Sequence, residues 1–187
     1  MSTDIRRSSP STPIGRSVAC HALGLSLCLA APFAVAQAPS PETAAKLRVL
    51  DAFLGSWEVT VRIRQPVPSV VTNIETYEWA LGGHFLRGDS GLKSDGTRDL
   101  VIATYVPAAD GYPLWIFSSS GAWFYLEPGK WDERAHTIEW KHAPNSPISY
   151  RISCEFPDDR TRHCVTLVKD WKGTVLHDQE LSAVRRP

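Results

Sequence analysis

The chain has no surplus of charge of either sign, since its 187 residues carry 20 Lys and Arg against 20 Asp and Glu. Proteins that bind nucleic acid usually carry a clustered basic surplus, so the composition argues against a nucleic-acid partner. After residue 36 the chain also lacks any apolar run long enough to cross a bilayer, so no stable membrane span is expected there. Residues 37–187 have the length of a single domain that can bury a core.

The first 36 residues have the pattern of a signal peptide. Arg6 and Arg7 provide a basic start, residues 18–35 form an apolar stretch, and Ala34 and Ala36 are the small residues of a cleavage site. Cleavage is predicted before Gln37, which gives a periplasmic or secreted protein. The alternative is a membrane anchor, because the stretch is about 18 residues long. The polar residues inside the stretch favour export.

Cysteine is scarce, and only Cys154 and Cys164 remain after the predicted cleavage. They flank a turn sequence that includes Pro157, Asp158 and Asp159, as in a hairpin. An exported protein meets an oxidising compartment, so we predict a disulfide between the two cysteines. The two residues can face each other only if the loop holds an odd number of residues. Two free buried thiols are the alternative.

Helical periodicity is absent between residue 55 and the C-terminus. Instead, short stretches of alternating apolar and polar residues are separated about every ten residues by turn pairs such as Asp95-Gly96 and Lys172-Gly173. This spacing is typical of an antiparallel sandwich or barrel. We predict an all-β, up-and-down, lipocalin-like antiparallel barrel of about ten strands. No internal repeat or low-complexity tract interrupts the pattern.

One helix is expected before the strands. Ser40 is a typical N-cap residue, and Pro41 suits the first helical position. Apolar residues then recur at helical spacing, and Gly55 ends the helix. The apolar stripe contains Leu47, Leu50, Phe53 and Leu54. The helix is predicted to close one end of the barrel.

Alternation in the first strands predicts which side chains face inward. The first strand covers residues 57–64, with Trp57 and Val59 inward. The next two cover residues 71–81 and 84–92, joined by a two-residue primed turn at Gly82-Gly83. This turn pairs Leu81 with His84, Trp79 with Leu86 and Tyr77 with Gly88. The more apolar face, with Tyr77, Trp79, Leu81, His84 and Leu86, is assigned inward, and Glu78 and Arg87 outward.

Three segments carry a resemblance to a known family. They are Leu50-x-x-x-Leu54-Gly55-x-Trp57, Glu78-Trp79-x-Leu81-Gly82-Gly83-x-Phe85-Leu86, and Gly129-x-Trp131-Asp132 followed by Thr137-Ile138-x-Trp140. Together they resemble the small bacterial exported family catalogued as domain of unknown function fifteen-seventy-nine. The resemblance implies a calycin-like barrel without a settled activity. Similar nitrobindin-like barrels hold haem, but Glu58-Val59-Thr60 stands where their glycine-rich segment would be, so haem is the weaker alternative.

No motif assigns a reaction. Gly88-Asp89-Ser90-Gly91 matches a serine-protease nucleophile motif, but it lacks the preceding histidine and aspartate at the required distance. The histidines and cysteines have no zinc-site spacing. We therefore assign no catalytic residue, no metal and no cofactor from the sequence.

The predicted function is binding of a small apolar or amphipathic ligand inside the barrel. The candidate ligand-binding residues are mostly aromatic: Tyr77, Trp79, His84, Trp115, Trp123, Tyr125, Trp140 and Tyr150. Two alternatives stay open, an enzyme that uses His84 as acid or base, and an interaction protein whose barrel is filled with side chains.

Overall fold

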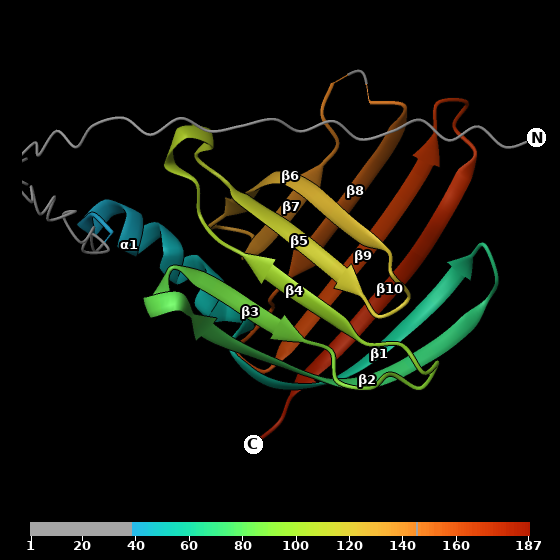
Figure 1. Cartoon of the computed structure of the whole chain (residues 1–187), viewed down its shortest axis with the longest axis horizontal. Helices are drawn as coiled ribbons and strands as arrows, with labels where there is room; N and C mark the ends of the chain where they lie inside the picture. Colours follow the sequence, from blue (N-terminus) through green and yellow to red (C-terminus); the bar gives the residue numbers. More distant parts are fainter. Residues whose placement is uncertain (1–38, 145) are drawn as a thin grey trace, which may run out of the picture. The chain divides into compact units, whose positions relative to one another are not determined.

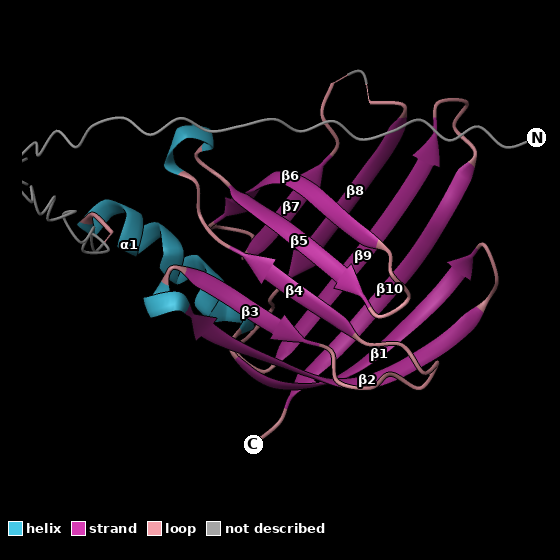
Figure 2. Ribbon diagram, in the orientation of Figure 1, coloured by secondary structure: helices cyan, strands magenta, loops and turns pink. Residues whose placement is uncertain are grey.

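The computed structural model describes residues 39–144 and 146–187, and ten antiparallel strands in them form one closed barrel (Figures 1 and 2). Each strand pairs with its neighbours in the sequence, and the first pairs with the last. The predicted all-β, up-and-down barrel is confirmed. The strands are β1 (Gly55–Gln65), β2 (Ser69–Ala80), β3 (Phe85–Asp89), β4 (Asp99–Ala103), β5 (Tyr112–Ser118), β6 (Trp123–Asp132), β7 (Thr137–Lys141), β8 (Ile148–Glu155), β9 (Thr161–Asp170) and β10 (Val175–Arg185). The predicted signal peptide lies outside the described residues.

The N-terminal helix begins as predicted. Helix α1 (Pro41–Leu47) follows Ser40, whose side chain accepts a hydrogen bond from the Thr43 N–H at 3.2 Å. The chain then tightens into a 3₁₀ helix, η1 (Arg48–Phe53), before β1. The apolar stripe of both helices is buried against the end of the barrel where β2 ends and β3 begins (Figure 1). No helix within the described residues is long and apolar enough to cross a membrane.

The β1 strand has the predicted alternation. Trp57 and Val59 are buried, whereas Glu58 between them is exposed. On its two sides β1 pairs with β2 and β10, so that Val59 lies opposite Asn73 and Ala183. This register determines which residues of β2 and β10 face the interior.

The predicted register between β2 and β3 is confirmed, but its turn is different. Tyr77 pairs with Gly88 and Trp79 with Leu86. The last pair is Ala80 with Phe85, and Leu81–Gly83 form a short 3₁₀ turn, η2, in place of a two-residue turn. Leu81 has a φ of 48° and is 77% exposed. Its predicted inward position is wrong because the sheet pairing ends at Ala80 and the left-handed backbone of Leu81 carries the chain out of the sheet.

The predicted disulfide is confirmed. Cys154 on β8 pairs directly with Cys164 on β9, and the two sulfur atoms are bonded. The strands are joined by residues 156–160, an odd number of loop residues, as direct opposition of the cysteines requires. Both cysteines face the interior and are buried.

Candidate functional site

The inner face of the barrel changes in exposure along its length. At the end nearest the helices the inward side chains are buried, and we call this region the closed half. It contains Trp57, Val59, Leu86, Ala103, Ile138, Trp140, Arg162 and Ala183. Toward the other end most side chains on the same face are only partly buried, although Val71 is buried, and we call this region the open half. It contains Val61, Ile63, Ile152, Thr166, Val168 and Leu181. Solvent therefore reaches the inner face in the open half.

Hydrogen bonds from the barrel wall hold the helical segment against the closed half. Each donor is an aromatic side chain with one polar atom, which is the usual way to bury such a group. Trp57 Nε1 donates to the Phe53 carbonyl at 2.7 Å, Trp79 Nε1 to Asp51 Oδ1 at 2.8 Å, and the Tyr112 hydroxyl to the Lys46 carbonyl at 2.9 Å. The helices and the wall thus form one closed end.

Arg185 at the end of β10 completes this closure. Its guanidinium carbon lies 4.3 Å from the centre of the Trp57 ring, in a cation–π contact. The same group donates hydrogen bonds to the carbonyls of Ala52 and Leu54, which lie on either side of the end of η1. Burial lowers the pKa of Arg185, and these carbonyls replace the water that it loses.

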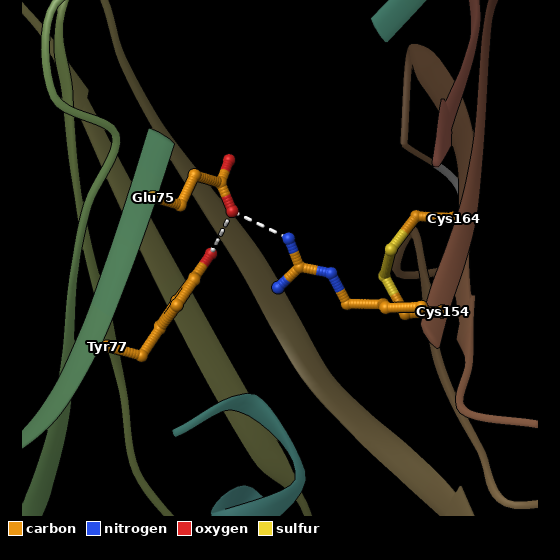
Figure 3. The surroundings of a disulfide bond; sticks show 5 residues. Glu75, Tyr77, Cys154 and Cys164 are labelled. Carbon is orange, nitrogen blue, oxygen red and sulfur yellow. Dashed lines mark hydrogen bonds and ion pairs between the residues drawn. A yellow bond between two sulfur atoms is a disulfide. The ribbon is translucent and has the colours of Figure 1, made fainter. Parts of the chain in front are cut away.

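A buried ion pair crosses the interior above the closed end. Arg162 Nη2 on β9 donates to Glu75 Oε2 on β2 at 2.6 Å, and the Tyr77 hydroxyl donates to the same oxygen at 3.2 Å (Figure 3). The Arg162 guanidinium also lies 5.5, 5.2 and 5.4 Å from the ring centres of Phe53, Trp57 and Tyr77. The pair therefore joins opposite sides of the barrel.

The charge states of this cluster follow from its surroundings. Burial lowers the pKa of Arg162, but Tyr77 and Glu75 outweigh that effect and the net direction is upward. Burial and the Glu75 carboxylate raise the pKa of Tyr77. The arginine therefore stays a cation and the tyrosine stays neutral at physiological pH. Within the described residues, Arg162 Nε and Nη1 are buried and have no hydrogen-bond partner.

Gly88 on β3 makes room for the Tyr77 ring. A Cβ atom at residue 88 would lie 2.3 Å from Tyr77 Cε1. The pair is directly cross-strand on the inner face. The missing side chain thus lets the tyrosine lie flat against the wall and reach Glu75.

We expect Gly88→Ala to destabilise the protein by about 1–3 kcal/mol, because the new methyl group displaces a ring in a packed interior. Denaturant unfolding measures the effect. In a Tyr77→Ala background the same substitution should cost much less, because the clashing ring is gone. Equal losses in both backgrounds would contradict this account.

Four of the eight predicted ligand-binding residues face the interior. Tyr77 and Trp79 lie near the closed end. Trp140 is 1% exposed and donates Nε1 to the Tyr112 carbonyl at 2.7 Å, so it belongs to the packed core. Tyr150 is partly buried, and its hydroxyl accepts a hydrogen bond from the Glu127 N–H at 2.8 Å.

Three predicted residues face outward and require a correction. Trp115 pairs with Tyr125 across β5 and β6, and Trp123 pairs with Phe117 on the same outer face. Trp123 is 66% exposed. The prediction placed large aromatic residues inside without a register for β5 and β6. Leu114 and Leu126 lie opposite each other and face inward, so alternation turns Trp115, Trp123 and Tyr125 outward.

His84 lies in the connection between β2 and β3 rather than in a strand. Its backbone is helical, its side chain is partly buried, and its carbonyl accepts a hydrogen bond from Thr104 Oγ1 at 2.7 Å. A role for His84 in binding stays a prediction.

No sequence motif singles out Arg162 or pairs Glu75 with another residue. A signal for Arg162 was present, because residue 162 shares a strand face with Cys164 and the disulfide places that face inward. Arg162 and Glu75 are 87 residues apart, so no local pattern joins them.

The residues around Ser90 have a structural role. Ser90 Oγ donates to the Gly91 carbonyl at 2.9 Å and accepts from the Asp99 N–H at 2.7 Å. Asp89 binds the Arg98 guanidinium through both carboxylate oxygens. Within residues 39–144 and 146–187, no three His, Cys, Asp or Glu side chains are grouped as metal ligands.

A groove on the outside of the barrel is the other concave surface that we considered as a binding site. It has a volume of about 600 Å³ and lies over β1, β2 and the residues after β3, between Glu58, Thr60, Thr72 and Leu92. The groove is shallow, and its β1 and β2 side chains are mostly polar. We place the candidate site in the interior because apolar side chains there are partly exposed and a buried ion pair lies below them.

Comparisons with known proteins assign the chain to no family. No family model and no curated protein matches the chain, so the resemblance to domain of unknown function fifteen-seventy-nine is not confirmed. Three similar solved structures have low identity. The S-type phycobiliprotein lyase of Guillardia theta is 11% identical, with a TM-score of 0.42 over 80% of this chain and 99% of that chain. A redesigned β-barrel bound to DFHBI is 13% identical, with a TM-score of 0.41 over 74% and 99%. A protein of unknown function from the DUF3598 family of Nostoc punctiforme is 12% identical, with a TM-score of 0.45 over 73% and 48%.

Proposed function

We propose that this protein binds a small apolar or amphipathic molecule in the open half of its barrel. The observation that carries the proposal is the partial exposure of Val61, Ile63, Val168 and Leu181 on the inner face. A ligand that covers these side chains removes apolar surface from water, at about 25 cal/mol per Å². A barrel filled by its own side chains would bury these residues as completely as those of the closed half.

We also propose that the protein is exported and begins at Gln37 in its mature form. The basic and apolar pattern of residues 1–36 supports export. The disulfide between Cys154 and Cys164 is consistent with an oxidising compartment such as the periplasm.

A pair of substitutions on β9 tests the binding site. Thr166 faces the open half, and its neighbour Val165 faces outward and is 48% exposed. Thr166→Trp should fill the open half and weaken uptake of the neutral fluorescent probe N-phenyl-1-naphthylamine at least about tenfold, or about 1.4 kcal/mol. Val165→Trp adds the same indole outside and should leave uptake unchanged.

Fluorescence titration of the wild type and both variants measures this effect. A wild-type protein that takes up no probe would contradict the proposed function. Equal losses in the two variants would show that the probe binds elsewhere or that the tryptophan disturbs the fold.

A further inference from the structure

The Glu75 carboxylate presents one unused oxygen to the open half. Both hydrogen bonds that it accepts, from Arg162 and Tyr77, end on Oε2. Among the described residues no side chain or backbone group donates to Oε1, and Figure 3 shows this oxygen directed away from the guanidinium and the tyrosine. The Glu75 side chain is 14% exposed, against 2% for Arg162. The reachable edge of the ion pair is therefore a hydrogen-bond acceptor.

Two nitrogen atoms of the Arg162 guanidinium, Nε and Nη1, have no hydrogen-bond partner among the described residues. On the barrel surface Arg64 uses Nε and Nη2 together and binds both oxygens of Asp178, at 3.0 and 2.9 Å. Arg162 binds Glu75 through Nη2 alone, and its Nε, on the same edge, has no partner in the described part of the chain. The unpaired Arg162 nitrogens are buried, so a ligand reaches the ion pair through Glu75 Oε1 and not through the guanidinium.

We infer that the Glu75–Arg162 pair is the polar end of the ligand site and selects an uncharged ligand with a hydroxyl head group. This inference rests on the proposed function and names the ligand class. A hydroxyl can donate to Glu75 Oε1, while the apolar chain extends along Val61 and Leu181. A carboxylate head group cannot donate, and it would lie beside the negative charge of Glu75.

Three compounds with the same ten-carbon chain and different head groups test the inference. 1-Decanol, decanoate and methyl decanoate are used at pH 8 to displace N-phenyl-1-naphthylamine from the wild-type protein. Decanol should displace the probe at a concentration at least about tenfold lower than either of the others. Methyl decanoate accepts but cannot donate, so it separates the hydrogen bond to Glu75 from simple apolarity.

Two substitutions on β2 test whether Glu75 causes the preference for decanol over decanoate. Glu75→Gln removes the negative charge and should reduce the preference for decanol over decanoate at least about fivefold. Glu78→Gln is the matched control, because Glu78 faces outward on the same strand and pairs with Arg87 on the surface. It should leave the preference unchanged. The wild-type comparison decides the inference even if Glu75→Gln does not fold.

The outcomes separate the inference from the proposed function. If the wild type binds no probe, both are overturned. If the probe binds but decanoate or methyl decanoate competes as well as decanol, the inference is overturned and the proposed function stands. A preference for decanol that persists unchanged in folded Glu75→Gln would also overturn the inference.

Discussion

The variant Arg162→Met is expected to lose about 3–5 kcal/mol of unfolding free energy, the usual effect of removing one partner of a buried ion pair. Glu75 would keep only the Tyr77 hydroxyl as a partner, in a position where little water reaches it. The three aromatic rings around the guanidinium would also lose their cation–π contacts. Urea unfolding followed by tryptophan fluorescence measures the loss.

Two further variants distinguish an uncompensated charge from poor packing. The double variant Arg162→Met with Glu75→Leu should recover most of the lost stability, because no buried charge remains. Arg64→Met removes the bidentate partner of Asp178 on the surface and should have a much smaller effect. If Arg162→Met and Arg64→Met were equally mild, the interior ion pair would not be buried as described.

Removal of the disulfide is expected to have the second largest effect on stability. Cys154 and Cys164 are 10 residues apart in the sequence. A disulfide that closes a loop of this size lowers the entropy of the unfolded chain and stabilises the folded protein by about 2–3 kcal/mol. The double variant Cys154→Ser with Cys164→Ser should therefore unfold at a lower temperature, by several degrees. Differential scanning calorimetry measures the change.

Chemical reduction provides the control for this variant. A reducing agent should lower the unfolding temperature of the wild type, but it should leave that of the double variant unchanged. Because both cysteines are buried, reduction of the folded wild type should be slow. Two titratable thiols in unfolded, never-reduced protein that begins at Gln37 would contradict the bond, because Cys154 and Cys164 are its only cysteines.

The fold could be predicted because its signals are local. Glycine and proline turns separate the strands, Ser40 and Pro41 mark the start of the helix, and alternation identifies Trp57 and Val59 as inward. The disulfide followed from the pairing of one hairpin. Each of these features depends on residues close together in the sequence.

The site could be predicted only in part because it depends on register and on distant contacts. The register of β5 against β4 and β6 determines that Trp115 and Tyr125 face outward, and no turn residue signals it. The positive φ of Leu81 likewise reverses a side chain that alternation placed inside. Glu75 and Arg162 meet only after the barrel has closed.

Closure of the barrel between β1 and β10 is expected to come late in folding. The pairs run from Trp57 with Arg185 to Gln65 with Asp178, so strands at opposite ends of the domain must find each other. Contacts of such long sequence separation carry a large loop-closure entropy and make folding slow. Until β10 is in place, β1 and β9 each present an unpaired edge that can join another chain. The cluster of Arg162, Glu75 and Trp57 joins β9, β2 and β1 across this closure, so we expect it to form late in folding and to be lost when β1 and β10 separate.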